Sequence, residues 1–100
     1  MADNTNVLVS GTSAAAPSFA GMIGLANSQR LAKNKSPLGW INPLLYKYAQ
    51  SFVVDVPAGR DNRCNLSGFC CAQGFVTTTG WDPMTGLGTL DFGRFLDKVM

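Results

Sequence analysis

Apolar and polar positions alternate with a helical period along the first third of the chain. This spacing predicts a helix over residues 13–33. Ala or Gly occupies positions 14, 15, 16, 20, 21, 24 and 26, so the helix has little side-chain bulk there and suits close packing against a sheet. Its apolar positions are Ala16, Phe19, Ile23 and Ala26.

Two shorter helices are predicted further along. Asn42 followed by Pro43 is typical of a helix start, which predicts a helix through Ala49. A second, amphipathic helix is expected within residues 90–100, where four apolar side chains share one face. These are Phe92, Phe95, Leu96 and Val99.

Short apolar runs predict strands at residues 7–9 and 52–54, and Gly-rich polar stretches predict loops at 57–74 and 77–88. With 100 residues and 46% hydrophobic content, the chain can form one modest core, so we expect a single unit over residues 1–100. Strands mixed with helices indicate the α/β class.

Charge and hydropathy exclude two kinds of partner. The net charge of +2 is too small and too scattered to predict nucleic-acid binding. The longest weakly polar stretch, residues 14–26, is interrupted by Pro17 and Ser18. It is also shorter than the roughly 20 residues that cross a bilayer, so no membrane association is expected.

The chain contains no His and no Glu, and its six acidic residues are all Asp. A Ser-His-Asp triad, a Cys-His pair and a His-ligated zinc site are therefore impossible within these residues. Any chemistry that they perform alone must use Ser, Thr, Cys, Asp, Lys or the backbone.

Three cysteines cluster at Cys64, Cys70 and Cys71, without the paired C-x-x-C spacing of structural zinc sites. Bridging two adjacent cysteines is strained, so we expect Cys64 to pair with one of them and the other to reach another segment. The Asn-x-Ser sequons at Asn34 and Asn65 also suggest a secretory protein. No signal peptide opens the chain, so we expect the protein to begin upstream.

The most informative stretch is Ser10-Gly11-Thr12-Ser13-Ala14-Ala15-Ala16-Pro17. A serine at a helix start, after a Gly-containing turn, lies beside backbone N–H groups that can stabilise an oxyanion. It could therefore serve as a nucleophile in acyl transfer. The alternative is a serine that simply caps a buried, Ala-rich helix, and local physics alone favours that alternative.

The octapeptide resembles the Ser-Gly-Thr-Ser-Ala-x-x-Pro signature of the sedolisins, the serine-carboxyl peptidases. The resemblance continues through Asn42-Pro43-Leu44-Leu45-Tyr46, Asp55-Val56 and the segment from Gly80 to Gly88. It implies the C-terminal portion of a subtilisin-like, parallel-sheet peptidase domain that is incomplete on its own. A subtilisin fragment is a weaker interpretation, because the segments that begin at Asn42 and at Gly80 do not resemble subtilisins.

The resemblance implies that Ser13 is the nucleophile of a serine-type peptidase that hydrolyses peptide bonds at acidic pH. Sedolisins use a Glu as the base, and an unperturbed Glu has a pKa of about 4.3. The family's Glu and Asp partners precede the serine, where this chain offers only Asp3, to which we assign no role. We therefore expect the isolated chain to be inactive, and to need the upstream part of the same domain as a partner and a peptide or protein as substrate.

The resemblance also implies a Ca²⁺ site and a secreted or lysosomal protein. Oxygen atoms in flexible Gly-rich loops suit calcium, although aspartates in loops are more often turn-formers. Thr78 stands where the family often has Gly, which makes it the weakest correspondence. The implied ligands are the side chains of Asp55 and Asp82 and the backbone carbonyls of Val56, Thr78 and Gly80.

A function of a different class is a non-catalytic, calcium-dependent binding or decoy module derived from a peptidase gene. It would need no base, whereas the enzyme requires a segment that carries Glu and Asp. We further expect the isolated chain to be marginally stable or prone to aggregation. Its small-residue helix needs a larger sheet to pack against than two or three short strands provide. We expect Trp40 and Trp81 to pack in the core or against loops rather than to bind substrate.

Overall fold

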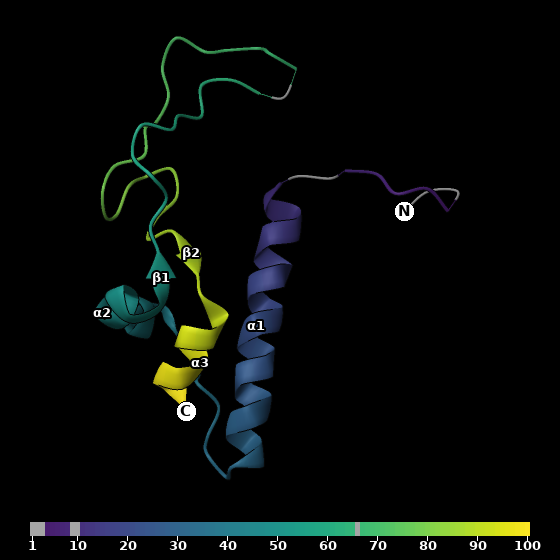
Figure 1. The fold of residues 1–100 in the computed structure, drawn as a ribbon, viewed down its shortest axis with the longest axis vertical. Helices are drawn as coiled ribbons and strands as arrows, with labels where there is room; N and C mark the ends of the chain where they lie inside the picture. Colours follow the sequence, from purple (N-terminus) through teal and green to yellow (C-terminus); the bar gives the residue numbers. More distant parts are fainter. Residues whose placement is uncertain (1–3, 9–10, 66) are drawn as a thin grey trace. The chain divides into compact units, whose positions relative to one another are not determined.

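Over residues 4–8, 11–65 and 67–100, which the computed structural model describes, the chain forms three helices and a two-stranded sheet (Figure 1). The chain divides into two units, Met1–Pro37 and Leu38–Met100. The first unit contains helix α1, and the second contains the sheet and the other two helices. Across the described residues, no helix is both long enough and apolar enough to cross a membrane.

Helix α1 spans Thr12–Ala32, within one residue of the prediction at each end. Gly11 caps its start with φ 136°, a backbone conformation that favours glycine. Pro17 lies inside the helix and cannot donate a hydrogen bond to the carbonyl of Ser13. At the next residue, the Ser18 hydroxyl donates to the Ala14 carbonyl at 2.7 Å.

The strand predicted at residues 7–9 is wrong for the two residues that the structure describes. Val7 and Leu8 belong to no strand, and their exposed fractions are 58% and 105%. Val9 lies outside the described residues. A strand exists only when a partner accepts its backbone hydrogen bonds, and an apolar run does not by itself provide that partner.

The second unit begins with helix α2, Asn42–Phe52, which runs three residues beyond the predicted end. Tyr48 marks a kink with φ −119° and ψ 22°, and the helix then continues to Phe52. Strand β1, Val53–Val54, follows at once, so the strand expected at 52–54 starts one residue later. The helix and the strand are joined without a loop.

The chain returns through strand β2, Thr89–Leu90, into helix α3, Phe92–Val99. This confirms the amphipathic terminal helix, with Phe95 and Val99 buried. The Asp91 carboxylate caps α3 by accepting from the Arg94 N–H at 3.1 Å. Packing of α2 on α3 centres on Phe52 and Phe95, whose rings meet edge to face with centroids 5.1 Å apart.

The sheet of the described residues has two strands. Strands β1 and β2 pair antiparallel, with Val53 opposite Leu90 and Val54 opposite Thr89. The parallel sheet expected of the whole domain stays a prediction, and β2 was not predicted. Its two residues carry no alternating pattern, and their pairing depends on Gly88, where any Cβ would overlap the Val54 carbonyl. The mixture of helix and strand agrees with the α/β class, while a subtilisin-like domain remains a prediction.

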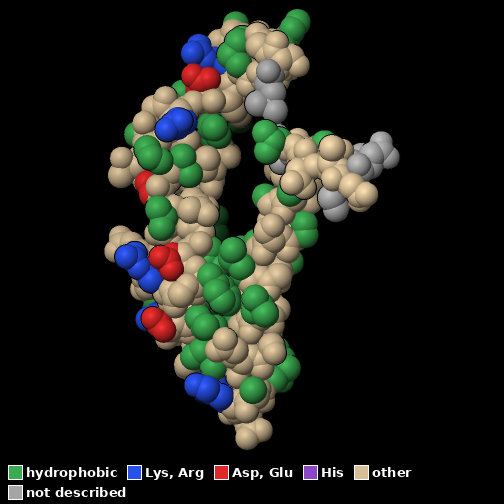
Figure 2. Space-filling view, turned by 45° about the vertical axis from the view of Figure 1, so that its right-hand side comes forward, with side chains coloured by type: hydrophobic (Ala, Val, Ile, Leu, Met, Phe, Trp, Pro, Cys, Tyr) green, Lys and Arg blue, Asp and Glu red, His purple; other side chains and the backbone are tan. Residues whose placement is uncertain are grey.

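Few large apolar side chains are buried. Among the described residues the fully buried aromatic side chains are Phe52 and Phe95, whereas Trp40 is 80% exposed and Phe69 is 78% exposed. Figure 2 shows hydrophobic side chains scattered over the visible surface. This exposure is in keeping with the expected shortage of core, and marginal stability of the isolated chain remains a prediction.

Candidate functional site: a serine helix and two aspartate loops

Ser13 is the second residue of α1 and its side chain is exposed. The helix cap is Gly11, whose carbonyl accepts from the N–H groups of Ala14 at 3.2 Å and Ala15 at 3.3 Å. Ser13 is therefore not the residue that caps the helix, so the simple capping interpretation does not describe it. Its hydroxyl lies in the first turn, where the helix dipole favours negative charge and the helix carries no acidic residue.

The second region consists of two paired loops, residues 55–60 and 77–86, which we call the aspartate loops. Backbone hydrogen bonds join them, from Gly59 N–H to the Thr77 carbonyl at 3.1 Å and from Thr77 N–H to the Arg60 carbonyl at 2.7 Å. The buried Thr77 hydroxyl also donates to the Pro57 carbonyl at 2.7 Å and accepts from the Arg60 N–H at 2.9 Å. Thr77 was not among the predicted site residues, because a run of three threonines is the only signal that the sequence gives for it.

Asp82 is fully buried within the second loop. Its Oδ1 accepts from the Thr85 N–H at 2.8 Å and the Thr85 hydroxyl at 2.9 Å, while Oδ2 accepts from the Thr78 N–H at 3.3 Å. Burial raises the pKa of this carboxyl, but the hydrogen bonds from Thr85, Thr78 and Met84 outweigh burial, so the pKa lies below its ordinary value. The loop is therefore organised around an ionised carboxylate.

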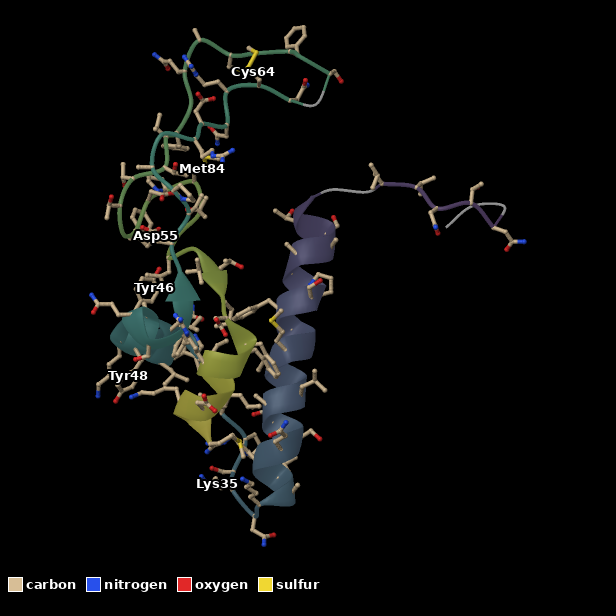
Figure 3. All side chains as sticks on the ribbon, viewed as in Figure 1. Lys35, Tyr46, Tyr48, Asp55, Cys64 and Met84 are labelled. Carbon is tan, nitrogen blue, oxygen red and sulfur yellow. A yellow bond between two sulfur atoms is a disulfide. The ribbon has the colours of Figure 1, made fainter. Side chains whose placement is uncertain are left out.

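Asp55 follows β1 and bridges the two loops. Its Oδ2 accepts from the Gly80 N–H at 2.6 Å, across 25 positions of sequence. Figure 3 shows Asp55 in the loop above β1, with Met84 in the adjoining loop. Gly80 has φ 83°, a left-handed conformation that glycine adopts without strain.

Four of the five residues predicted as calcium ligands are bonded in pairs, Asp55 with Gly80 and Asp82 with Thr78. These bonds come from the backbone N–H groups of Gly80 and Thr78, so the role of their carbonyls as ligands stays a prediction. The fifth, Val56, directly follows Asp55. In the part of the chain that the structure describes, no three His, Cys, Asp or Glu side chains form a group able to hold a metal. Backbone oxygens would have to complete any site here.

Both tryptophans are more exposed than predicted, at 80% for Trp40 and 54% for Trp81. Trp81 and the loop residues Asp55 and Gly80 line a cavity of about 640 Å³, together with residues of α2 that include Tyr46. Neither residue is therefore packed in the core, while the alternative of packing against loops stays a prediction.

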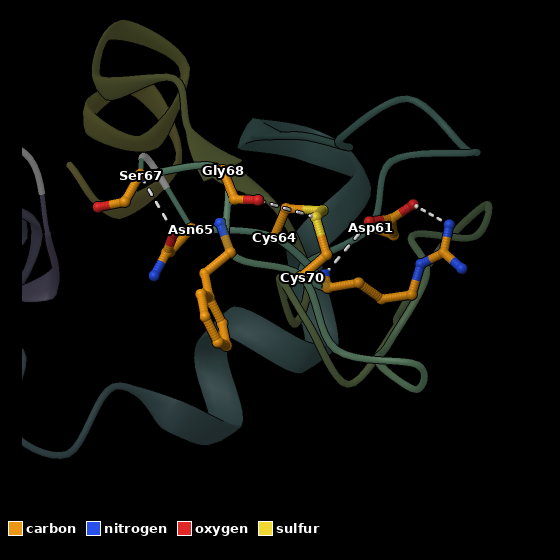
Figure 4. Close-up of a disulfide and its surroundings, with 8 residues drawn as sticks. Asp61, Cys64, Asn65, Ser67, Gly68 and Cys70 are labelled. Carbon is orange, nitrogen blue, oxygen red and sulfur yellow. Dashed lines mark hydrogen bonds and ion pairs between the residues drawn. A yellow bond between two sulfur atoms is a disulfide. The ribbon is translucent and has the colours of Figure 1, made fainter.

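The cysteine loop, from Cys64 to Cys70, lies between the two aspartate loops in sequence and is closed by a Cys64–Cys70 disulfide (Figure 4). Cys71 is exposed as a free thiol, so among the described residues it does not form the expected link to another segment. The disulfide selects one of the two pairings left open by the sequence. Asp61, near this loop, forms an ion pair with Arg63 at 3.2 Å. Hydrogen bonds from the Arg63 backbone and guanidinium lower the pKa of Asp61.

Comparison with known proteins adds relatives to this exposed serine and pair of aspartate loops. The chain is 47% identical to tripeptidyl-peptidase 1 of Dictyostelium discoideum, 44% identical to tripeptidyl-peptidase sed1 of Aspergillus fumigatus and 41% identical to tripeptidyl-peptidase 1 of Bos taurus. These alignments cover 88%, 93% and 92% of this chain but only 14%, 13% and 16% of the relatives.

The chain matches a segment of tripeptidyl-peptidases of the sedolisin family, and it spans about one-seventh of the length of these curated relatives. No family model matches the chain, and no solved structure matches it. The family assignment therefore rests on sequence identity to curated relatives, and these are named as peptidases.

Proposed function

We propose that these residues supply the nucleophile and a calcium site to a serine-type peptidase that acts on peptides or proteins at acidic pH. The observation that carries this proposal is the identity of 41–47% to tripeptidyl-peptidases over about nine-tenths of the chain. The position of Ser13 in the exposed first turn of α1 supports it.

In the proposed reaction, Ser13 Oγ attacks the scissile carbonyl and its proton passes to a carboxylate base. The tetrahedral oxyanion is stabilised near the N-terminus of α1, the amine leaves with the proton, and water then hydrolyses the acyl-enzyme. The base comes from residues beyond this chain, since the chain contains no Glu. A Glu base with a pKa of about 4.3 implies an acidic working pH, in a lysosomal or secreted setting.

The calcium proposal agrees with the donor atoms of the aspartate loops. Ca²⁺ takes about six to eight oxygen ligands, and two carboxylates with three backbone carbonyls form an all-oxygen set. Asp82 Oδ1 already accepts two hydrogen bonds, whereas Oδ2 is engaged by a longer one and retains capacity for a metal. When bound, the ion would join the two loops that Asp55 and Gly80 already link.

Replacing the nucleophile tests the catalytic proposal. In the native protein that carries these residues, Ser13→Ala should lower hydrolysis of a tripeptide-coumarin substrate at acidic pH by roughly 10⁴- to 10⁶-fold. The matched control is Ser18→Ala, one turn further along the same helix and also exposed, which should retain activity. Full activity of Ser13→Ala would refute the proposed nucleophile and favour a non-catalytic binding module.

Calorimetric titration with Ca²⁺ tests the metal proposal. Calcium at about 100 times its Kd should stabilise the native protein by about 2.7 kcal/mol, measured as a rise in Tm. Asp55→Asn should weaken binding, while Asp97→Asn, an exposed aspartate on α3, should leave it unchanged. Equal calcium affinity in both variants would show that the aspartate loops do not hold the ion.

A further inference from the structure

We propose that Asn65 is an N-glycan acceptor and that Asn34, the second sequon, stays unmodified. The inference rests on the proposed lysosomal or secreted setting, and it concerns residues outside the proposed active site and calcium site. The donor would be the lipid-pyrophosphate-linked oligosaccharide of the secretory pathway. A bond forms from Asn65 Nδ2 to the sugar C1, the bond from C1 to the pyrophosphate oxygen breaks, and Nδ2 loses one proton.

The carboxamide of Asn65 is oriented for this modification. Its Oδ1 accepts from the Ser67 N–H at 3.0 Å and from the Phe69 N–H at 2.9 Å. Because both partners are donors, the atom that they contact must be the oxygen rather than the nitrogen. Neither bond uses Nδ2, which points away from them in Figure 4.

A glycosylated asparagine keeps its Oδ1 as an acceptor, so the sugar can be attached without breaking either loop hydrogen bond. The side chain is also exposed, within the segment that the Cys64–Cys70 disulfide closes. A disulfide forms in the same oxidising compartment in which N-glycans are added. The folded loop is therefore compatible with a sugar on Asn65.

Asn34 presents a different environment, although its side chain is exposed too. It is the second residue after α1 and has φ 61°, and Arg30 Nε donates to the Ser36 carbonyl at 2.8 Å. Pro37 follows Ser36 and restricts its backbone to extended conformations. The backbone of Ser36 is thus constrained by residues outside its sequon, whereas the Ser67 N–H is bonded to Asn65 of its own sequon, so we expect Asn34 to fit the acceptor site of an enzyme less well.

A glycan on Asn65 would also cover an apolar surface. The Phe69 side chain is 78% exposed, and its backbone is bonded to Asn65. Exposed aromatic groups promote association of a protein with itself. A sugar beside Phe69 would shield the ring from such contacts.

Enzymatic glycan release in isotopically heavy water tests this proposal. The native protein that carries these residues is purified from its source cells, treated with peptide-N-glycosidase in ¹⁸O-water and mapped by mass spectrometry. We expect heavy aspartate at position 65 and unmodified asparagine at position 34. Unmodified Asn65, or a label at Asn34, would overturn the proposal.

Two variants, expressed in a eukaryotic secretory host, complete the test. Ser67→Ala deletes the sequon hydroxyl but keeps the Ser67 N–H that Asn65 accepts, so the label at 65 should be lost and the loop kept. Asn34→Gln is the matched control and should leave the glycan mass unchanged. An unlabelled Asn65 beside an intact Cys64–Cys70 disulfide would refute the glycan alone, whereas reduced cysteines would refute the proposed compartment as well.

Discussion

Helix α1 and the aspartate loops position their residues by different physical means. The first turn of α1 places Ser13 through regular backbone hydrogen bonds, and its neighbours are mostly small and exposed. The aspartate loops place Asp55 and Asp82 through side-chain hydrogen bonds to backbone groups, around the buried Thr77. One region depends on a repeating element, and the other depends on particular pairs of atoms.

This difference indicates which region can organise itself within these residues. The loops hold an ionised carboxylate by contacts that are all within residues 55–86. The serine has the helix dipole but no base in this chain, and a serine without its base is a poor nucleophile. The loops should therefore respond to changes within the second unit, whereas α1 should tolerate substitutions that preserve the helix.

The largest effect on stability is expected from the aromatic pair beneath the loops. Phe95→Ala removes the ring that packs against Phe52 and should lower the free energy of unfolding by about 3–5 kcal/mol. Denaturant titration of the native protein measures this loss. Phe69→Ala, which removes a ring that is 78% exposed, should change stability by less than about 0.5 kcal/mol. Equal losses would show that the second unit is not organised around Phe95.

Two glycine substitutions compare the regions directly. Gly88→Ala places a Cβ against the Val54 carbonyl and Asp55 at φ 119°, and should cost about 1–3 kcal/mol. Gly21→Ala adds a Cβ to α1 with no atom within 4 Å and should stabilise the helix by about 0.5–1 kcal/mol. Amide hydrogen exchange in the native protein reports both changes. A destabilising Gly21→Ala would contradict the expected tolerance of α1.

The smallest expected effect is a loss of stability at low pH. The lowered pKa of Asp82 means that its stabilisation is complete above the ordinary value of 3.8 and is lost as the pH falls through the lower, folded-state pKa. Thermal unfolding from about pH 5 to about pH 2.5 should therefore show a decline only at the acidic end. Asp82→Asn should flatten this decline, whereas Asp97→Asn should preserve it. An unchanged decline in both would assign it to other groups, among them Asp61.

The sequence predicted the elements that carry strong local signals. Helical spacing located α1 to within one residue at each end, and Asn42-Pro43 correctly located the start of α2. The octapeptide around Ser13 identified the family, which the comparisons confirm. These successes depend on patterns that are contained within a few turns of chain.

Features that depend on distant pairing could not be predicted in this way. Strand β2 has two residues and forms only because it pairs with Val53 and Val54 of β1. The apolar run at Val7 and Leu8 looked like a strand, but nothing in the sequence showed whether a partner would be present. The contact of Asp55 with Gly80 and the burial of Thr77 likewise join positions about 20 or more residues apart.

The antiparallel pairing of β1 with β2 fixes both ends of one long excursion of the chain, residues 55–88. Within such a closed stem, the entropy of closure rises only slowly with length, by about 0.6 kcal/mol for each doubling. Backbone pairs inside the excursion, between Asp61 and Val76 and between Asn62 and Phe75, divide it into shorter closed segments, so each closure is made over fewer residues than the full excursion. The two-residue β1–β2 ladder holds both ends of this excursion next to α2 and α3, so residues 55–88 can vary in sequence while α2 and α3 stay in place.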